Sequence, residues 1–110
     1  MSVNRVTLLG TVCQRPRITT FEDGGRVANV RMCTEERGYT TADGREIAGR
    51  KEYHNLVIHR PGVIDYIKDN VKQHDSIYVE GKMRTRSYGD EDDKRYITEV
   101  YVDVLEYLGW

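Results

Sequence analysis

Residues 76–88 read SIYVEGKMRTRSY, and this stretch decides the fold. Small or apolar side chains alternate with polar or charged ones, which is the period-two pattern of a half-buried β-strand. One face would carry Ile77, Val79, Gly81, Met83 and Thr85. The opposite face would carry Tyr78, Glu80, Lys82, Arg84, Arg86 and Tyr88. The stretch therefore predicts a long strand with one buried side and one basic, aromatic side.

Four more runs share this alternation, and one segment between them has a helical period. The predicted strands are residues 3–12, 26–34, 52–59 and 95–108, together with 76–88. Between the third and fourth strands, apolar residues recur at helical spacing from Val63 to Val71, with an end near Asn70. Pro61 and Asp65 suit the start of this helix.

Polar segments separate the predicted strands. Residues 13–25 are expected to form a loop, with a turn at its end. Residues 35–51 are also polar, and Asp43-Gly44 within them is a typical hairpin turn. The order is therefore three strands, one helix and two strands, with hairpins joining strands 2–3 and 4–5.

This order favours an all-β protein with an OB-fold, a five-stranded Greek-key barrel with one short α-helix between strands 3 and 4. An open antiparallel sheet with a helix on one face is the alternative. A chain of 110 residues is long enough for one domain, so a single OB-fold domain over residues 1–110 is expected.

Overall charge gives no sign of a polyanion partner, because the formal net charge is −1. Any anion-binding site must therefore come from local segregation of charge.

The longest apolar runs fall far short of the ~20 residues of a membrane helix, and the N-terminus lacks a signal-peptide pattern. We expect a soluble chain that is not exported. Cys13 and Cys33 could form one bridge, but without an export signal they are expected to be reduced fillers.

Catalytic and metal-binding motifs do not occur in the sequence. The three histidines and two cysteines have no zinc-ligand spacing, and neither cysteine belongs to a C-x-x-C unit. The nucleophile elbow G-x-S-x-G, the P-loop and G-x-G-x-x-G are also missing. We therefore expect a protein that is not an enzyme and needs no metal or other cofactor.

The informative pattern is the interleaving of aromatic and basic residues. Proteins that bind single-stranded nucleic acid need aromatic rings for the bases and cations for the phosphates. Lys82, Arg84, Arg86 and Tyr88 provide both on one strand face, and Tyr53 could provide a second ring. The alternative is that tyrosine is simply a good strand residue and that the basic row is a solvated strand edge.

Five segments together resemble bacterial single-stranded DNA-binding proteins, the SSB family. They are VNRVTLLG (3–10), GGRVANV (24–30), EYHNLV (52–57), VEGKMRTRSY (79–88) and YITEV (96–100). The resemblance implies an OB-fold that binds single-stranded DNA with little regard to sequence. It also implies protection of exposed strands in replication, recombination and repair, in the cytoplasm and associated with the nucleoid. The other hypothesis is an OB-fold adaptor of the replication-restart type, acting mainly through protein contacts.

The resemblance also implies roles for individual residues. The family's base-stacking aromatics fall at Tyr53 and Tyr88, with a looser match at Tyr39 and a histidine, His59, at a fourth position. Basic contacts of the family match Arg5, Lys72, Arg84 and Arg86, to which Lys82 is added from its strand face.

Assembly and partners follow from the same resemblance. The family is generally a homotetramer, and its subunit contacts match the first strand and the surface near His54. Thr7 and Leu9 form part of an outward row that is unusually apolar for a solvent-facing strand edge. Family members usually continue into a flexible segment with an acidic, apolar-tipped end that recruits enzymes. The sequence given ends at Trp110, so partners of that segment are not expected from these residues.

Overall fold

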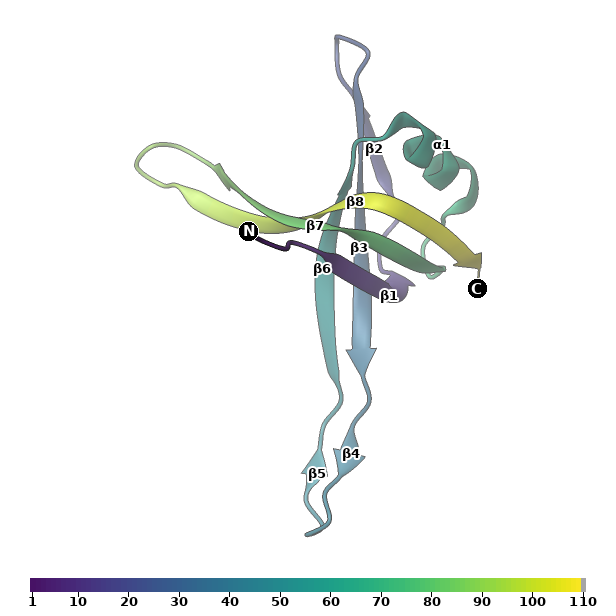
Figure 1. Cartoon of the computed structure of the whole chain (residues 1–110), viewed down its shortest axis with the longest axis vertical. Coiled ribbons are helices and arrows are strands. Elements are labelled where there is room, and N and C mark those ends of the chain that lie inside the picture. The colour runs from purple at the N-terminus through teal and green to yellow at the C-terminus, as the bar shows by residue number, and fades with distance from the viewer. Residues whose placement is uncertain (110) are drawn as a thin grey trace.

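The computed structural model describes residues 1–109, and Trp110 lies outside the described residues. Five strands form a closed ring in the order β1-β7-β8-β6-β3, and a short β1–β3 pairing closes it (Figure 1). They are β1 (Val6–Val12), β3 (Arg26–Glu36), β6 (Arg50–Ile58), β7 (Ser76–Tyr88) and β8 (Arg95–Gly109). The ring confirms the predicted barrel, and its closure shows that the open sheet is wrong.

Helix α1 (Pro61–Asn70) lies between β6 and β7, as predicted, and packs against β3 and β8. Pro61 occupies the first turn, where a missing N–H costs nothing, and the Val71 N–H bonds to the Ile67 carbonyl at the other end. Asp65 lies beyond the first turn and is paired with Arg26 at 2.8 Å, so its predicted role at the helix start is wrong.

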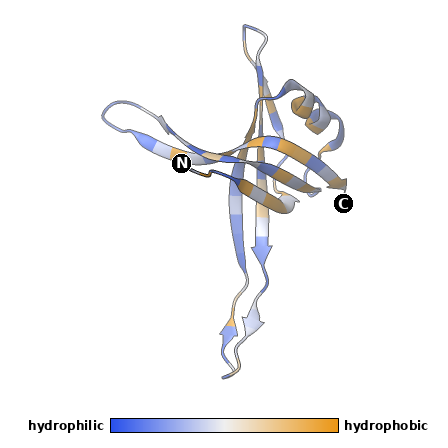
Figure 2. Ribbon diagram, in the orientation of Figure 1, coloured by the Kyte–Doolittle hydropathy of each residue, from blue (hydrophilic) through white to orange (hydrophobic). Residues whose placement is uncertain are grey.

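The core fills the ring and the space beneath α1. Its largest fully buried side chains are Val12, Met32, Leu56, Ile58, Ile64, Ile67, Ile77 and Val79. Apolar residues gather in the ring and on α1, whereas the hairpin arms are mostly hydrophilic (Figure 2). Burial of this apolar surface is the main stabilising contribution.

The β3–β6 and β7–β8 hairpins extend beyond the ring as arms, and the turn between β2 and β3 also projects from it (Figure 1). The β3–β6 hairpin ends in a small second sheet made of β4 (Tyr39–Thr40) and β5 (Glu46–Ile47). Its tip is the predicted Asp43-Gly44 turn, where Gly44 has a φ of +88°. The β7–β8 hairpin forms the other arm, so Met83 and Thr85 are exposed there although their alternation predicted a buried face.

Strand β2 and the start of β1 differ from the prediction, and the ends of β3, β6 and β8 also differ by one or two residues. The expected loop at 13–25 contains β2 (Arg17–Thr20), which pairs with the start of β3. Ile18 is the one residue of β2 that packs on the core, so the segment has no alternation to reveal it. Strand β1 begins at Val6 rather than Val3 because the Asn4 side chain exchanges two hydrogen bonds with the Met83 backbone, at 2.8 and 2.9 Å.

Glycine is required where strands approach most closely. A Cβ at Gly81 would collide with the Tyr101 carbonyl oxygen, at the β-bulge between β7 and β8. A Cβ at Gly10 would collide with the carbonyl oxygen of Cys33, beside the β1–β3 closure. Both glycines therefore allow the sheet to bend into a ring.

Candidate nucleic-acid interface

The outer face of the ring brings together residues from five strands. Cross-strand partners run Arg17–Asn29–Val57–Tyr101–Lys82 in one row from β2 to β7. Two positions along the strands from this row, Arg31 on β3 pairs with Asn55 on β6. Arg84 on β7 likewise pairs with Glu99 on β8. We call this surface the basic–aromatic face, and its charged and ring-bearing residues are Arg17, Arg31, Tyr53, His59, Lys82, Arg84, Arg86, Tyr88, Glu99 and Tyr101.

Two arginine–tyrosine contacts organise this face. The Arg31 guanidinium lies 4.9 Å from the centroid of the Tyr53 ring, and the Arg84 guanidinium lies 4.9 Å from that of Tyr101. Both distances are within the range of a cation–π interaction. The His59 ring lies 5.5 Å from Tyr101. Tyr53 remains 52% exposed, so much of its ring is open to a ligand.

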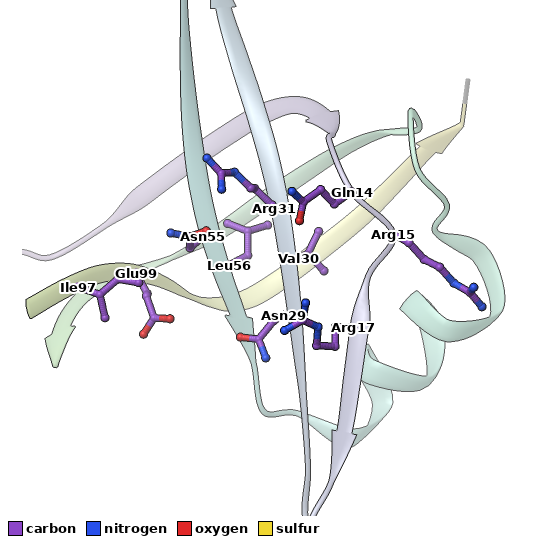
Figure 3. Close-up of a pocket in the computed structure, with 10 residues that line it drawn as sticks. All are labelled: Gln14, Arg15, Arg17, Asn29, Val30, Arg31, Asn55, Leu56, Ile97 and Glu99. Carbon is purple, nitrogen blue, oxygen red and sulfur yellow. The ribbon is translucent and has the colours of Figure 1, made fainter. Parts of the chain in front are cut away.

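The face is hollowed in two places. One shallow hollow of about 240 Å³ is lined by the side chains of Arg17, Asn29, Arg31, Asn55 and Glu99, among others (Figure 3). In the same view the Arg15 side chain points away from the other lining residues and toward α1. A second hollow of about 200 Å³ is lined by His59, Arg60, Lys82, Arg84 and Tyr101, among others.

Among the described residues, several cations of this face are free of carboxylate partners although the whole chain is nearly neutral. Eight cations pair with carboxylates in the described structure: Arg5, Arg26, Arg45, Arg50, Lys51, Arg60, Arg86 and Arg95. Within residues 1–109, Arg17, Arg31, Lys82 and Arg84 form no such ion pair, and all four lie on the basic–aromatic face. The other described cations without such an ion pair lie outside the face, namely Arg15, Arg37, Lys68, Lys72 and Lys94. Positive charge is therefore available on the face but is not confined to it.

One carboxylate interrupts this positive surface. The Arg86 Nε donates to Glu99 Oε1 at 2.8 Å, and only 5% of Glu99 is exposed. This hydrogen bond and the charge of Glu99 raise the pKa of Arg86 above its ordinary value. Arg86 is therefore held in place and largely neutralised by its partner.

Six of the nine predicted DNA-binding residues share this face: Tyr53, His59, Lys82, Arg84, Arg86 and Tyr88. The other three lie elsewhere. Tyr39 is 62% exposed on β4, at the end of the long arm. Arg5 precedes β1 and pairs with Glu80 at 3.3 Å. Lys72 lies in the turn after α1, which bonds to the end of β1 through Gln73 and His74.

The residues predicted to make subunit contacts lie in two separate places, on β1 and on β6. Leu9, 61% exposed, and Leu108, 44% exposed, line a shallow apolar hollow on the outside of β1 and its neighbours. Thr7 is exposed on the same strand side. His54 lies on β6, where its Nε2 is 2.9 Å from the Thr34 hydroxyl. The structure does not bring His54 next to Leu9.

Four residues of the face were missed by the sequence analysis: Arg17, Arg31, Glu99 and Tyr101. The first belongs to the unrecognised strand β2. Tyr101 could have been found by extending the β7–β8 hairpin outward from its turn, since Lys82 and Tyr101 then become partners. The contact between Arg31 and Tyr53 depends on the β3–β6 register, which the long polar arm obscured.

Other kinds of site find little support in the described part of the chain. Residues 1–109 contain no group of three or more His, Cys, Asp or Glu side chains that could hold a metal ion. No helix in this part is long and apolar enough to cross a membrane.

Known proteins resemble the chain over almost its whole length. The model of the Single-strand binding protein family matches residues 3–108. A single-stranded DNA-binding protein of Bacteroides thetaiotaomicron is 45% identical over 109 residues, which cover 98% of this chain and 67% of that protein. One from Rhizobium meliloti is 35% identical over 102 residues, which cover 90% of this chain and 57% of that protein. The chain therefore spans only part of these relatives.

The fold also has a solved counterpart. The structure described as Plasmodium falciparum SSB complex with ssDNA superimposes with a TM-score of 0.86 at 24% identity. The match covers 98% of this chain and 96% of the other. At this level of identity the similarity shows the fold alone, and it confirms the predicted OB-fold.

Proposed function

Because this chain belongs to the single-strand binding protein family, we propose that it binds single-stranded DNA with little sequence preference. It protects strands exposed in replication, recombination and repair, in the cytoplasm and at the nucleoid. Residues 1–110 act as one DNA-binding domain. The proposal includes no catalytic step and no cofactor.

The observation that carries the proposal is the pair of arginine–tyrosine contacts on the basic–aromatic face. Every base has a π-face, so an exposed tyrosine can stack any unpaired base, at about 1–3 kcal/mol for each stack. Tyr53 and Tyr88 are 52% and 47% exposed, which leaves ring surface for a base. Tyr101 lies between His59 and Arg84 and provides a third ring. Stacking therefore supplies most of the affinity.

The phosphates are bound by the cations of the face that have no carboxylate partner. Arg17 and Arg31 border one hollow, and Lys82 and Arg84 border the other. A strand crossing the row from β2 to β7 would meet all four. Because only a few cations are involved, the salt dependence of binding is shallow for a DNA-binding protein.

Longer strands reach further parts of the protein. Tyr39 on the long arm, Arg5 and Lys72 make additional contacts with DNA that extends past the basic–aromatic face. The chain assembles as a homotetramer through the side of β1 that carries Thr7 and Leu9, with a separate contact near His54. One strand can then visit several faces, and the multiple contacts raise the overall affinity.

The test is a titration of fluorescent oligo-dT with the protein at several salt concentrations, repeated with unlabelled duplex of equal length as competitor. Stacking requires unpaired bases, so we expect tight binding, a shallow salt slope and poor competition by the duplex. Equal competition by duplex would mean that the face is a plain polyanion site. Absence of oligo-dT binding would instead favour the OB-fold adaptor.

A further inference from the structure

The two cysteines of the chain meet where the ring closes. Only Thr11–Cys33 and Val12–Met32 are paired between β1 and β3. Just beyond this ladder, the Cys13 N–H donates to the Arg31 carbonyl at 2.8 Å. Cys13 is therefore opposite Arg31 and Cys33 opposite Thr11, which places the two cysteines diagonally across the closure.

Both thiols project from the same side of the sheet. Their neighbours Val12 and Met32 are fully buried in the core, so the alternating positions 13 and 33 point outward. Both residues are free thiols and only partly buried. Diagonal neighbours on one face of an antiparallel pair lie about 7–8 Å apart, and the Cys33 side chain is near enough to raise the pKa of the Cys13 thiol through a side-chain hydrogen bond.

We propose that Cys13 and Cys33 form a thiol pair that a disulfide-containing oxidant converts into an intramolecular disulfide, joining β1 to β3. The inference rests on the fold and does not require DNA binding. The expectation that both cysteines act only as reduced fillers would then hold only under reducing conditions.

The reaction is an ordinary double exchange with a small disulfide, RSSR. The Cys33 thiolate attacks one sulfur of RSSR, which forms a mixed disulfide and releases RS⁻. The Cys13 thiolate then attacks the Cys33 sulfur and releases the second RS⁻. The two protons lost by the cysteines are taken up by the two released thiolates, so both cysteines are oxidised and RSSR is reduced to 2 RSH.

The order of attack follows from the surroundings of Cys13. Burial, and next the neighbouring Cys33 thiol, raise the pKa of Cys13 to about 11, whereas Arg31 and Lys51 oppose this effect. Cys13 is thus protonated at neutral pH and is a poor first nucleophile, so Cys33 begins the exchange.

A bridge here would strengthen one of the two shortest strand pairings of the barrel, since β6 and β8 are likewise joined by only two partner pairs. The closure depends on a short ladder, whereas β7 and β8 pair along nearly their whole length. A covalent link between positions 13 and 33 restricts the unfolded chain, which stabilises the folded state. We expect the melting temperature to rise by about 5 °C or more.

The test uses the chain with glutathione disulfide as oxidant, followed by N-ethylmaleimide labelling and intact mass under non-reducing conditions. We expect the mass of a single chain less two hydrogens, no uptake of label, a higher melting temperature and reversal by dithiothreitol. The variants Cys13→Ser and Cys33→Ser are the matched controls, and neither should show the two-hydrogen loss or the higher melting temperature. Two labelled thiols, glutathione on both cysteines, a bridge between two chains or an unchanged melting temperature would overturn the proposal.

Discussion

Replacing Glu99 with Gln should strengthen DNA binding and make it more sensitive to salt. Glu99 lies within the basic–aromatic face, lines its larger hollow and neutralises Arg86 at 2.8 Å (Figure 3). Glutamine keeps nearly the same shape and can still accept from Arg86, but it carries no charge. Arg86 then becomes a further cation available to a phosphate, and the repulsion between Glu99 and the strand disappears.

The size of the effect follows from counterion release. Each additional phosphate contact on a single strand steepens the slope of log K against log salt by about 0.7. Between about 50 and 200 mM salt, the Kd for oligo-dT should therefore increase by a further factor of about 2.6 over the wild-type increase. The assay is a fluorescence titration of oligo-dT at both salt concentrations.

Glu22→Gln is the matched control, because Glu22 is exposed in the turn between β2 and β3. It changes the net charge by the same amount outside the face, so its salt slope should stay near the wild-type value. An unchanged slope or weaker binding in a folded Glu99→Gln variant would refute the assignment of Arg86 to the DNA surface.

Two further predictions concern Tyr101 and the assembly. Tyr101→Val keeps a good strand residue but removes the ring between His59 and Arg84, so oligo-dT binding measured by fluorescence should weaken at least about fivefold while thermal unfolding changes little. Equal affinity would exclude Tyr101 from the stacking surface. Light scattering of the DNA-free protein should give about four times the 12.8 kDa chain mass, and Leu9→Glu should dissociate the assembly. A mass near 12.8 kDa for the wild type at micromolar concentration would rule out the tetramer.

Local patterns predicted those parts of the fold in which one strand face is buried and the other is solvated. Residues 76–88 show both outcomes: the predicted bounds are those of β7 and its first half has one buried face, but both faces are exposed from Met83 onward. The helix after Pro61 was also clear, because its apolar spacing changes period. By contrast, β2 was missed because a short edge strand with one packed side chain, Ile18, has no periodic signal.

The site was predicted strand by strand, but not across strands. The alternation on residues 76–88 identified Lys82, Arg84, Arg86 and Tyr88 as one row. It could not show that Glu99 neutralises Arg86, because that contact depends on the register of β7 with β8. The partners of the tyrosine rings likewise depend on packing between strands that lie far apart in the sequence.

The central claim is that bases stack on the tyrosines of the basic–aromatic face. The most direct test is the affinity of the double variant Tyr53→Ala, Tyr88→Ala for fluorescent oligo-dT. Tyr96→Ala is the control, since Tyr96 is 70% exposed on the same β7–β8 arm but is the partner of Ser87 rather than of the basic row. We predict that the double variant binds at least about tenfold more weakly with unchanged thermal unfolding, while Tyr96→Ala binds as the wild type does. Wild-type affinity in the folded double variant would contradict the claim.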